Sequence, residues 1–318
     1  MAQSKPSVIV IGASYLDLAI RSKEIPSAGQ TASGSSFSCR ITGSGVIQAT
    51  EAALCGCEVH LISKIGKDPL ARNIIDNLQK YEINTDLITT SEAKTTGAMV
   101  TMVNALGENA VCVSPGANLQ LKASDIENAE QVIAAARVCL IHGEMPLDAV
   151  IAAIRLANLH KVKVLLDPGF GINKNTRRPS ELPMDYFNVN VLLPNIHEAA
   201  ELAEEPLTDF HKAKLVGSDL VARGAENVVI KMGRRGSLLV NRNGSEQIEP
   251  FEVEMVDRTC AGDAFAGALA AYCALDSNMI EAVRFASAAG AIACTKFGCQ
   301  ESLPKKEDIL ELLHLSEL

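Results

Sequence analysis

Short apolar runs alternate with stretches of helical spacing along most of the chain, and this alternation limits the fold more than any other feature. Many of the apolar runs are continuous, as in strands of a parallel sheet that helices cover on both faces. We predict strands at 7–14, 59–66, 97–104, 109–115, 138–143, 162–168, 191–195 and 227–233. We predict helices at 44–58, 68–83, 124–137, 146–160 and 209–225. The expected fold is α/β, with a central, mostly parallel sheet and helices on both faces.

Two features of this pattern indicate where a ligand would bind. Four of the predicted strands end in the polar sequences IHGE, LLDP, LLPN and IKMG. In folds of this kind, ligands bind outside the carboxyl ends of the strands. Residues 27–43 interrupt the alternation with a polar, serine-rich stretch of weak period two. This stretch is either a flexible linker or, as we prefer, a small layer of strands that covers the site.

Length and charge narrow the class of protein. The 318 residues, 47% of them hydrophobic, provide ample core, and we expect one domain over residues 1–318. No uninterrupted apolar stretch approaches about 18 residues and no targeting segment is recognisable, so we expect no membrane span and a cytoplasmic protein. The net charge of −9 and the lack of Trp argue against a nucleic-acid partner.

The cysteine pattern favours free thiols. The nine cysteines are odd in number and include no C-x-x-C pair, and several lie in apolar runs such as VCL at 138–140. We therefore expect buried free thiols in a reducing compartment rather than disulfides. A structural zinc site is not expected either, because the six His residues lack ligand spacing.

The stretch DRTCAGDAFAGAL, residues 257–269, passes from small and polar residues into a helical apolar pattern. Apolar residues from Phe265 onward recur at helical spacing, which predicts a helix that begins near Ala261. The free N–H groups of its first turn, from Cys260 to Asp263, and the positive end of the helix dipole form an anion site. Asp263 is then either an acidic residue favoured in a first turn or a general base beside a phosphate group.

The same stretch resembles the D-T-x-G-A-G-D-x-F signature of the ribokinase family of ATP-dependent carbohydrate kinases, also called the PfkB family. The spacing and the AGD core match, whereas Arg258 and Cys260 depart from the family pattern. Further motifs resemble the family in the same order: VIVIGASYLD, TGSGVIQA, LLPNIHEAAELA, VVIKMGRRGSLL and AAGAIACTKFGCQESLP. The resemblance covers nearly the whole chain. It implies a ribokinase-like three-layer fold with a small β-strand lid at about 27–43 and 96–114.

The resemblance also implies a reaction, the ATP-dependent phosphorylation of a hydroxyl group on a sugar or sugar-like molecule. Asp263 would act as the general base. The implied anion hole is formed by the backbone of Cys260, Ala261 and Gly262. Asn195 and Glu198 would act on Mg²⁺ and the phosphates through water, since Mg²⁺ favours few protein carboxylates. The alternative is that Asn195 and Glu198 only form a capping box at a helix start.

Two further groups of positions follow from the resemblance. Those that would border the nucleotide are Lys231, Gly233, Gly236 and Gly262. Lys231 stands where the family often has a small hydroxyl residue, and it either touches phosphate or reaches solvent. Those that align with a monovalent cation site are Asp257, Thr259, Ala293, Lys296, Gly298 and Ser302. The implied cofactors are ATP, Mg²⁺ and K⁺, and the implied assembly is a homodimer through the lids.

The substrate side departs from the family pattern. The candidate substrate contacts are Asp17, Tyr15, Gly43, Ser44, Ile47, Glu144 and Asp263. Ile47 replaces the asparagine of the G-G-x-x-x-N motif, which in the family hydrogen-bonds sugar hydroxyls. Ser44 and Tyr15 stand where ribokinase has lysine and asparagine. These changes disfavour ribose, and we expect a larger or less polar substrate, such as a nucleoside or a modified sugar.

Three alternative functions compete with the carbohydrate kinase. The chain is alternatively a nucleoside kinase of the same family, or a catalytically weak protein that senses a sugar or nucleotide. The lost asparagine motivates the sensor, whereas the retained AGD and N-x-x-E sequences argue against it, because a sensor needs no general base. A nicotinamide dehydrogenase would rest on VIVIGAS, which fails the G-x-G-x-x-G spacing.

Overall fold

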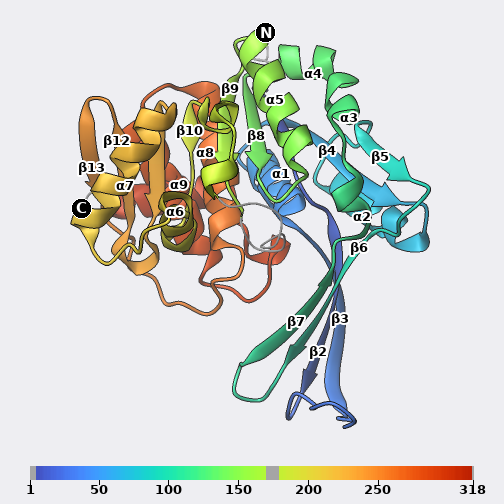
Figure 1. Cartoon of the computed structure of the whole chain (residues 1–318). Helices are drawn as coiled ribbons and strands as arrows, with labels where there is room; N and C mark the ends of the chain where they lie inside the picture. Colours follow the sequence, from blue (N-terminus) through green and yellow to red (C-terminus); the bar gives the residue numbers. More distant parts are fainter. Residues whose placement is uncertain (1–4, 170–178, 317–318) are drawn as a thin grey trace.

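The computed structural model of the chain describes residues 5–169 and 179–316. Its larger sheet has nine strands in the order β13-β12-β11-β10-β9-β8-β1-β4-β5 (Figure 1). These strands are β1 (Ser7–Ile11), β4 (Glu58–Gly66), β5 (Ile88–Ser91), β8 (Val138–His142), β9 (Lys163–Asp167), β10 (Val191–Leu192), β11 (Asn227–Lys231), β12 (Ser237–Asn241) and β13 (Gly244–Ile248). Only the pairs β11–β12 and β12–β13 within this sheet are antiparallel. The expected parallel sheet is confirmed.

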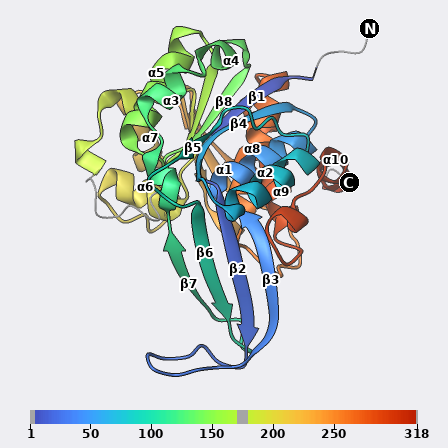
Figure 2. The same ribbon diagram turned by 90° about the vertical axis from the view of Figure 1, so that its right-hand side faces the viewer.

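Each central strand contributes to two cores, because successive side chains point to opposite faces of a sheet. Val8 and Val10 of β1 pack into one core, and Ile9 and Ile11 pack into the other. Helices α1 (Ser44–Leu54), α2 (Pro69–Lys80), α8 (Ala261–Leu275), α9 (Met279–Ala293) and α10 (Lys306–Leu315) close the first core. Helices α3 (Ala123–Glu127), α4 (Glu130–Ala135), α5 (Leu147–Leu159), α6 (Ile196–Ala203) and α7 (Phe210–Arg223) close the second. The sheet thus lies between two layers of helices (Figure 2).

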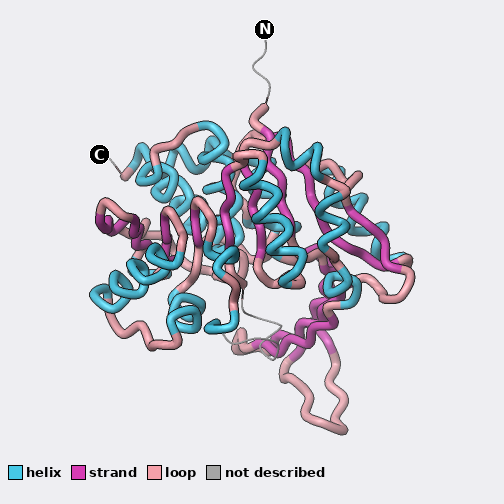
Figure 3. The backbone as a smooth tube through the Cα atoms, turned by 45° about the horizontal axis from the view of Figure 1, so that its top comes forward, coloured by secondary structure: helices cyan, strands magenta, loops and turns pink. Residues whose placement is uncertain are grey.

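A second, four-stranded sheet projects from the body as the lid (Figures 1 and 3). Its order is β3-β2-β6-β7, formed by β2 (Tyr15–Ser22), β3 (Gly34–Thr42), β6 (Gly97–Val103) and β7 (Asn109–Ser114). The preferred reading of 27–43 as a strand layer is confirmed for β3. The sequence did not separate β2 from β1, because only three residues turn the chain from one apolar strand into the next.

Several elements differ from the sequence prediction. The helix expected at 124–137 is divided into α3 and α4 by a break at Asn128 and Ala129. Strands β5, β12 and β13 were not predicted. Strands β5 and β13 carry mainly polar residues, whereas β12 is an apolar run of ordinary length that the prediction missed. Among the described residues, no helix combines the length and the apolar character that a membrane crossing requires.

The expectation that all cysteines are free thiols is wrong for two of them. Cys260 and Cys299 form a disulfide, with a Cα–Cα distance of 5.3 Å. The cause is the packing of α9 against α8, which returns the end of α9 to the start of α8. A Cβ placed on Gly290 near the end of α9 would lie 3.0 Å from the carbonyl oxygen of Ala261. The remaining seven cysteines are free, and four of them are buried.

Close backbone contact fixes where α1 begins relative to β1. Gly12 follows β1, and Gly45 lies in the first turn of α1. A Cβ on Gly12 would lie 2.6 Å from the Cα atom of Gly45, so a side chain at this crossing would push the helix away from the strand. The first turn of α1 is thereby held at the carboxyl end of β1.

Candidate active site

Helix α8 begins at Ala261, as the sequence predicted, with Cys260 at its N-cap. The N–H groups in the first turn of a helix have no i−4 carbonyl partner and remain available to an anion. Gly262 is exposed in this turn. A Cβ placed on Gly262 would meet, among the described residues, only Lys231 Nζ within 4 Å, at 3.9 Å. The first turn of α8 therefore faces open space with a cation on its far side.

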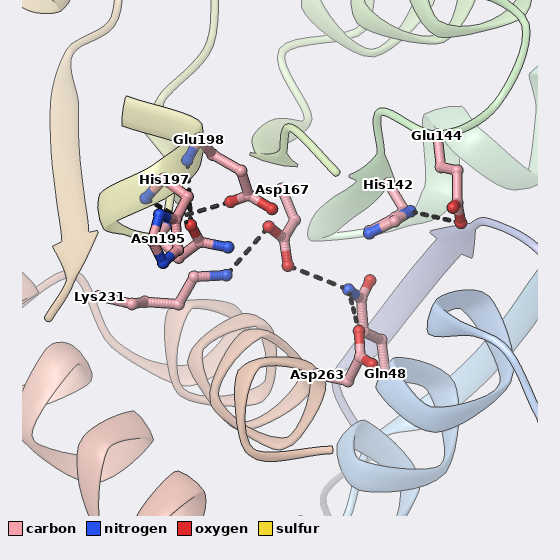
Figure 4. A network of polar contacts seen from close by, with 9 residues as sticks. All are labelled: Gln48, His142, Glu144, Asp167, Asn195, His197, Glu198, Lys231 and Asp263. Atoms are coloured by element: carbon pink, nitrogen blue, oxygen red, sulfur yellow. Dashed lines mark hydrogen bonds and ion pairs between the residues drawn. The ribbon is translucent and has the colours of Figure 1, made fainter. Parts of the chain in front are cut away.

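Asp263 lies in the same turn and is held from a second helix. Gln48 of α1 donates a hydrogen bond from Nε2 to Asp263 Oδ1 over 2.9 Å (Figure 4). Burial raises the pKa of the Asp263 carboxyl above its usual value, and it outweighs the opposing effect of His142 and of the Gln48 hydrogen bond. A carboxylate with a raised pKa is a better proton acceptor. The geometry thus suits a base beside an anion site.

Polar groups from the ends of neighbouring strands meet in front of α8, as the strand-end rule predicted. Asp167 ends β9 and Lys231 ends β11, and Lys231 Nζ donates to Asp167 Oδ1 over 3.0 Å (Figure 4). Gln48 Nε2 also donates to Asp167 Oδ2, over 3.3 Å. The side chain of Lys231 is only 13% exposed. Of the two readings of Lys231, the one in which it reaches solvent is therefore wrong.

His142 ends β8 and forms a second polar group at this edge, together with Glu144 (Figure 4). His142 Nδ1 lies 3.8 Å from Glu144 Oε2, and both side chains are nearly buried. Burial raises the pKa of Glu144, while His142 opposes this rise. His142, Asp167 and Asp263 each offer one ligand atom, and these three atoms lie within 4.8 Å of one another. The three residues therefore have the spacing to hold a metal ion.

Asn195 and Glu198 form the capping box that the sequence left open as an alternative. Asn195 Oδ1 accepts from the backbone N–H groups of His197 at 2.9 Å and Glu198 at 3.0 Å. Glu198 Oε2 accepts from the Asn195 N–H over 2.7 Å. Burial raises the pKa of Glu198, and the charge of Lys231 opposes this rise. The box uses one oxygen of each side chain and holds both residues at the edge of the site.

The candidate substrate residue Asp17 lies on the lid, in β2. Thr101 of β6 donates to its Oδ1 over 2.8 Å, and Arg40 of β3 donates to its Oδ2 over 2.8 Å. Arg40 also lies over the ring of Phe297, 5.8 Å from its centroid, and Arg21 lies 4.5 Å from the same centroid. Both oxygens of Asp17 are therefore engaged, and the lid contacts the segment that follows α9.

The other candidate substrate residues divide into two sets. Gly43 is the N-cap residue of α1 and Ser44 is its first residue, so both lie at the carboxyl end of β1. Tyr15 is 1% exposed and Ile47 is 0% exposed, and both side chains belong to the apolar cores. Ile47 in particular offers no surface to a ligand in this conformation.

The positions aligned with a monovalent cation site lie on two facing segments. The Asp257 backbone N–H donates to the Cys294 carbonyl over 3.1 Å, and Ser302 Oγ donates to the Gly298 carbonyl over 3.0 Å. Thr259 lies next to Asp257 and donates its backbone N–H to Asp257 Oδ1 over 3.0 Å. Ala293 ends α9, and Lys296 is exposed in the loop that follows. The structure thus places these six positions on two segments that touch at Asp257 and that the Cys260–Cys299 disulfide joins.

Gly233 and Gly236 lie in the turn between β11 and β12, directly after Lys231. Both have positive φ, of 59° and 79°. Because β11 runs parallel to β10, this turn leaves the sheet at the same edge as the other strand ends.

Comparison with known proteins identifies the family and the fold. A model of the family described as pfkB family carbohydrate kinase matches residues 5–306. The chain belongs to this family. It is 30% identical over 311 residues to the deoxyribokinase of Salmonella typhi, covering 98% of this chain and 99% of that protein. It is also 30% identical over 311 residues to the ribokinase of Haemophilus influenzae, covering 97% and 99%.

The solved structure of Arabidopsis thaliana ribokinase complexed with ribose and ATP has the same fold. It matches with a TM-score of 0.87 and 24% identity, covering 98% of this chain and 99% of that chain. Family membership confirms the expected enzyme class. This pfkB kinase is an ATP-dependent phosphotransferase that acts on a hydroxyl group of a sugar or sugar-like molecule.

Three residues at the centre of this pfkB kinase site were not singled out by name from the sequence. His142 and Asp167 lie in the strand ends IHGE and LLDP, so the general rule for parallel sheets located them without giving them a role. Gln48 lies inside the quoted motif TGSGVIQA. Its buried position, 0% exposed in a helix, depends on the crossing of α1 with β1, which local sequence does not reveal.

Proposed function

We propose that this pfkB kinase transfers the γ-phosphoryl group of ATP to a hydroxyl group of a deoxysugar or nucleoside, with Asp263 as the general base. The observation that carries this proposal is the first turn of α8, where Asp263 lies beside exposed Gly262 and free backbone N–H groups. Asp263 accepts the hydroxyl proton as the new O–P bond forms. The N–H groups from Cys260 to Asp263 stabilise the charge on the transferred phosphoryl group.

Gln48 positions the base in this proposal. Its Nε2 donates to Asp263 Oδ1, which leaves Oδ2 of Asp263 to face the substrate hydroxyl. Gln48 Oε1 is buried and has no hydrogen-bond partner among the described residues. The amide therefore presents its donor to the base and fixes the carboxylate in one orientation.

Mg²⁺ and a monovalent cation would complete the site. Glu198 retains Oε1 outside the capping box, and a carboxylate oxygen suits an ion that keeps several waters. Asn195 retains Nδ2, which can donate to a phosphate oxygen or to a water of the ion. Gly233 and Gly236 would border the nucleotide. Carbonyl oxygens of the segments at 257–259 and 293–302 would hold K⁺.

The substrate would be less polar than ribose. The relatives named deoxyribokinase and ribokinase support a pentose-like molecule. Asp17 is already engaged by Thr101 and Arg40, and Ile47 is buried, so the polar groups offered to sugar hydroxyls are few. Ser44 and Glu144 would form the remaining polar wall. A substrate with one hydroxyl group fewer than ribose would not leave a buried hydroxyl group without a hydrogen-bond partner in such a site.

We also propose a cytoplasmic homodimer that associates through the lid. Strands β3 and β7 are the two edges of the lid sheet, and unpaired strand edges favour pairing with another chain. Phe37 on β3 is 64% exposed and Val111 on β7 is 50% exposed. A monomeric mass in solution would contradict the dimer.

The test of the proposed function is substrate-dependent ADP release in Mg-ATP and K⁺, across deoxyribose, ribose, hexoses and nucleosides. Wild type would be compared with Asp263→Asn, which removes the base but keeps the size of the side chain. Asp276→Asn, at the other end of α8, serves as the matched control. We expect release with a deoxysugar or nucleoside that disappears in Asp263→Asn only. Release that persists in Asp263→Asn, or the absence of release with every compound, would refute the proposal.

A further inference from the structure

Lys231 turns into the active site although lysine side chains usually reach solvent. It lies at the carboxyl end of β11, and its ammonium group points toward the strand end that carries Asp167 (Figure 4). The two are joined by an ion pair of 3.0 Å, in which Asp167 is 5% exposed. A buried ion pair is costly to form, because both charges lose their hydration. Its position at the centre of the site therefore suggests that it serves function rather than stability.

The ammonium group lies opposite the anion hole. Lys231 Nζ is 3.9 Å from the point that a Cβ on Gly262 would occupy. That point projects from the exposed first turn of α8, whose N–H groups are free to bind phosphate. A phosphoryl group on this turn would thus have backbone N–H groups on one side and the ammonium group of Lys231 on the other.

Lys231 reaches this position as one half of an ion pair, so it is present as an ammonium group. Its Nζ donates to Asp167 Oδ1 over 3.0 Å, and its side chain is only 13% exposed. A positive charge is therefore held within reach of an anion on the first turn of α8.

We propose that Lys231 is a catalytic residue that binds the oxygens of the transferred phosphoryl group, and that Asp167 positions it. The proposal rests on the kinase function proposed above. In the reaction, the bond between the γ-phosphorus and the bridging oxygen breaks, and its electron pair leaves with ADP. The substrate oxygen forms the new bond to phosphorus, and its proton passes to Asp263. Lys231 keeps its own proton and supplies only charge.

This role predicts a loss in the chemical step rather than in substrate binding. Charge on the transferred group is stabilised most strongly in the transition state, where removal of one preorganised donor costs about 10²- to 10³-fold in kcat. We therefore expect Lys231→Met to lower kcat by about that factor, with KM for the sugar changed by less than about threefold. In Lys231→Ala, which vacates the space of the side chain, a small alkylammonium ion such as ethylammonium should restore part of kcat.

The decisive comparison separates this role from a merely structural ion pair. Lys231→Met leaves Asp167 buried without its partner, which can disturb the fold, whereas Lys231→Met/Asp167→Asn removes both charges. Lys163→Met is the matched control, since Lys163 is a partly buried lysine at the opposite end of β9. We expect the double variant to fold and to remain about 10²-fold or more below wild type in kcat. The corresponding Lys231→Ala/Asp167→Asn variant, which has room for the amine, should respond to ethylammonium. A double variant with wild-type kcat, or a Lys231→Ala/Asp167→Asn variant insensitive to ethylammonium, would overturn the proposal.

A binding measurement tests Lys231 even if no sugar in the panel is turned over. Beryllium fluoride with Mg-ADP mimics a bound γ-phosphoryl group. We expect it to tighten ADP binding to wild type and to the Lys163→Met control, but not to the double variant, whose affinity for ADP alone should stay within about threefold. Equal tightening in wild type and double variant, or no tightening in either, would overturn the proposal. Failure of the sugar panel alone would count against the proposed function and not against Lys231.

Discussion

The Cys260–Cys299 disulfide joins two segments of the active site, so its removal should cost stability that can be calculated. The perturbation is Cys260→Ala/Cys299→Ala, which removes both thiols and leaves no unpaired one. Cys260 is 5% exposed and Cys299 is 9% exposed, so alanine suits both positions. The expected effect comes from the unfolded chain, which gains conformational freedom when the cross-link is absent.

The size of the effect follows from the sequence separation of 39 residues. Closing a loop of this length removes about 13 cal/mol/K of chain entropy, which corresponds to about 4 kcal/mol at 25 °C. Unfolding entropy of about 2.1 cal/mol/K per residue over the 318 residues converts this into a fall in Tm of about 6 °C. The shift is modest because the chain is long.

Thiol counting and calorimetry together provide the assay. Denatured wild type purified without reductant should show seven thiols, and nine after reduction, because two of the nine cysteines are paired. The double variant should show seven in both conditions and melt about 6 °C lower than oxidised wild type. Cys294→Ala is the matched control, since Cys294 is a free cysteine in the same segment, and its Tm should change by less than about 2 °C.

Two results would refute this reasoning. Nine thiols in unreduced wild type would show that the disulfide does not form. Seven thiols with an unchanged Tm in the double variant would show that the cross-link forms but contributes nothing to stability.

Four further predictions concern charge and space near the site. Burial raises the pKa of Glu51 in α1 well above 4.5. The protonated carboxyl therefore contributes stability at low pH, and this contribution is lost as the pH rises from about 4.5 through the raised pKa. Glu51→Gln should flatten the resulting fall in Tm above about pH 5, and an unchanged profile would contradict this. Because burial raises the pKa of Asp263 above 3.8, kcat/KM should fall as the pH drops through that raised value. A profile that does not fall toward acid while the protein stays folded would exclude a basic role. Gly262→Ala should lower kcat at least about tenfold, because the new methyl group fills the space that the transferred phosphoryl group would occupy. Its free energy of unfolding, measured with denaturant, should rise by about 0.5 kcal/mol, because alanine favours the helix more than glycine. Full activity would argue against the anion hole. Replacing K⁺ by choline should slow turnover, and equal rates would remove the monovalent cation from the mechanism.

Local signals in the sequence were sufficient for most of the central parallel strands and for the position of Asp263. The apolar runs gave the parallel strands, and the change from small residues to helical spacing gave the start of α8 at Ala261. Asp263 followed, because its place in the first turn is fixed by sequence distance alone. The lid was anticipated from the polar, period-two stretch that contains β3.

Pairings between distant segments could not be predicted in the same way. Lys231 and Asp167 come from β11 and β9, and their contact depends on the strand order, in which only β10 lies between them. The disulfide depends on how α9 packs on α8, and the Gln48 contact depends on the crossing of α1 with β1. Each of these is set by tertiary packing, which spacing along the chain does not encode.

The strand order of the large sheet also determines when activity becomes available during synthesis. From β8 to β13 each strand pairs with the strand made just before it, so the sheet widens at one edge in the order in which the ribosome delivers the chain. The strand ends that carry His142, Asp167 and Lys231 therefore leave the ribosome before α8. Asp263 and the first turn of α8 follow the last strand, so a chain that stops at β13 has the sheet edge but lacks the proposed base and the proposed anion hole. Phosphoryl transfer would thus require a segment that is made after the whole sheet.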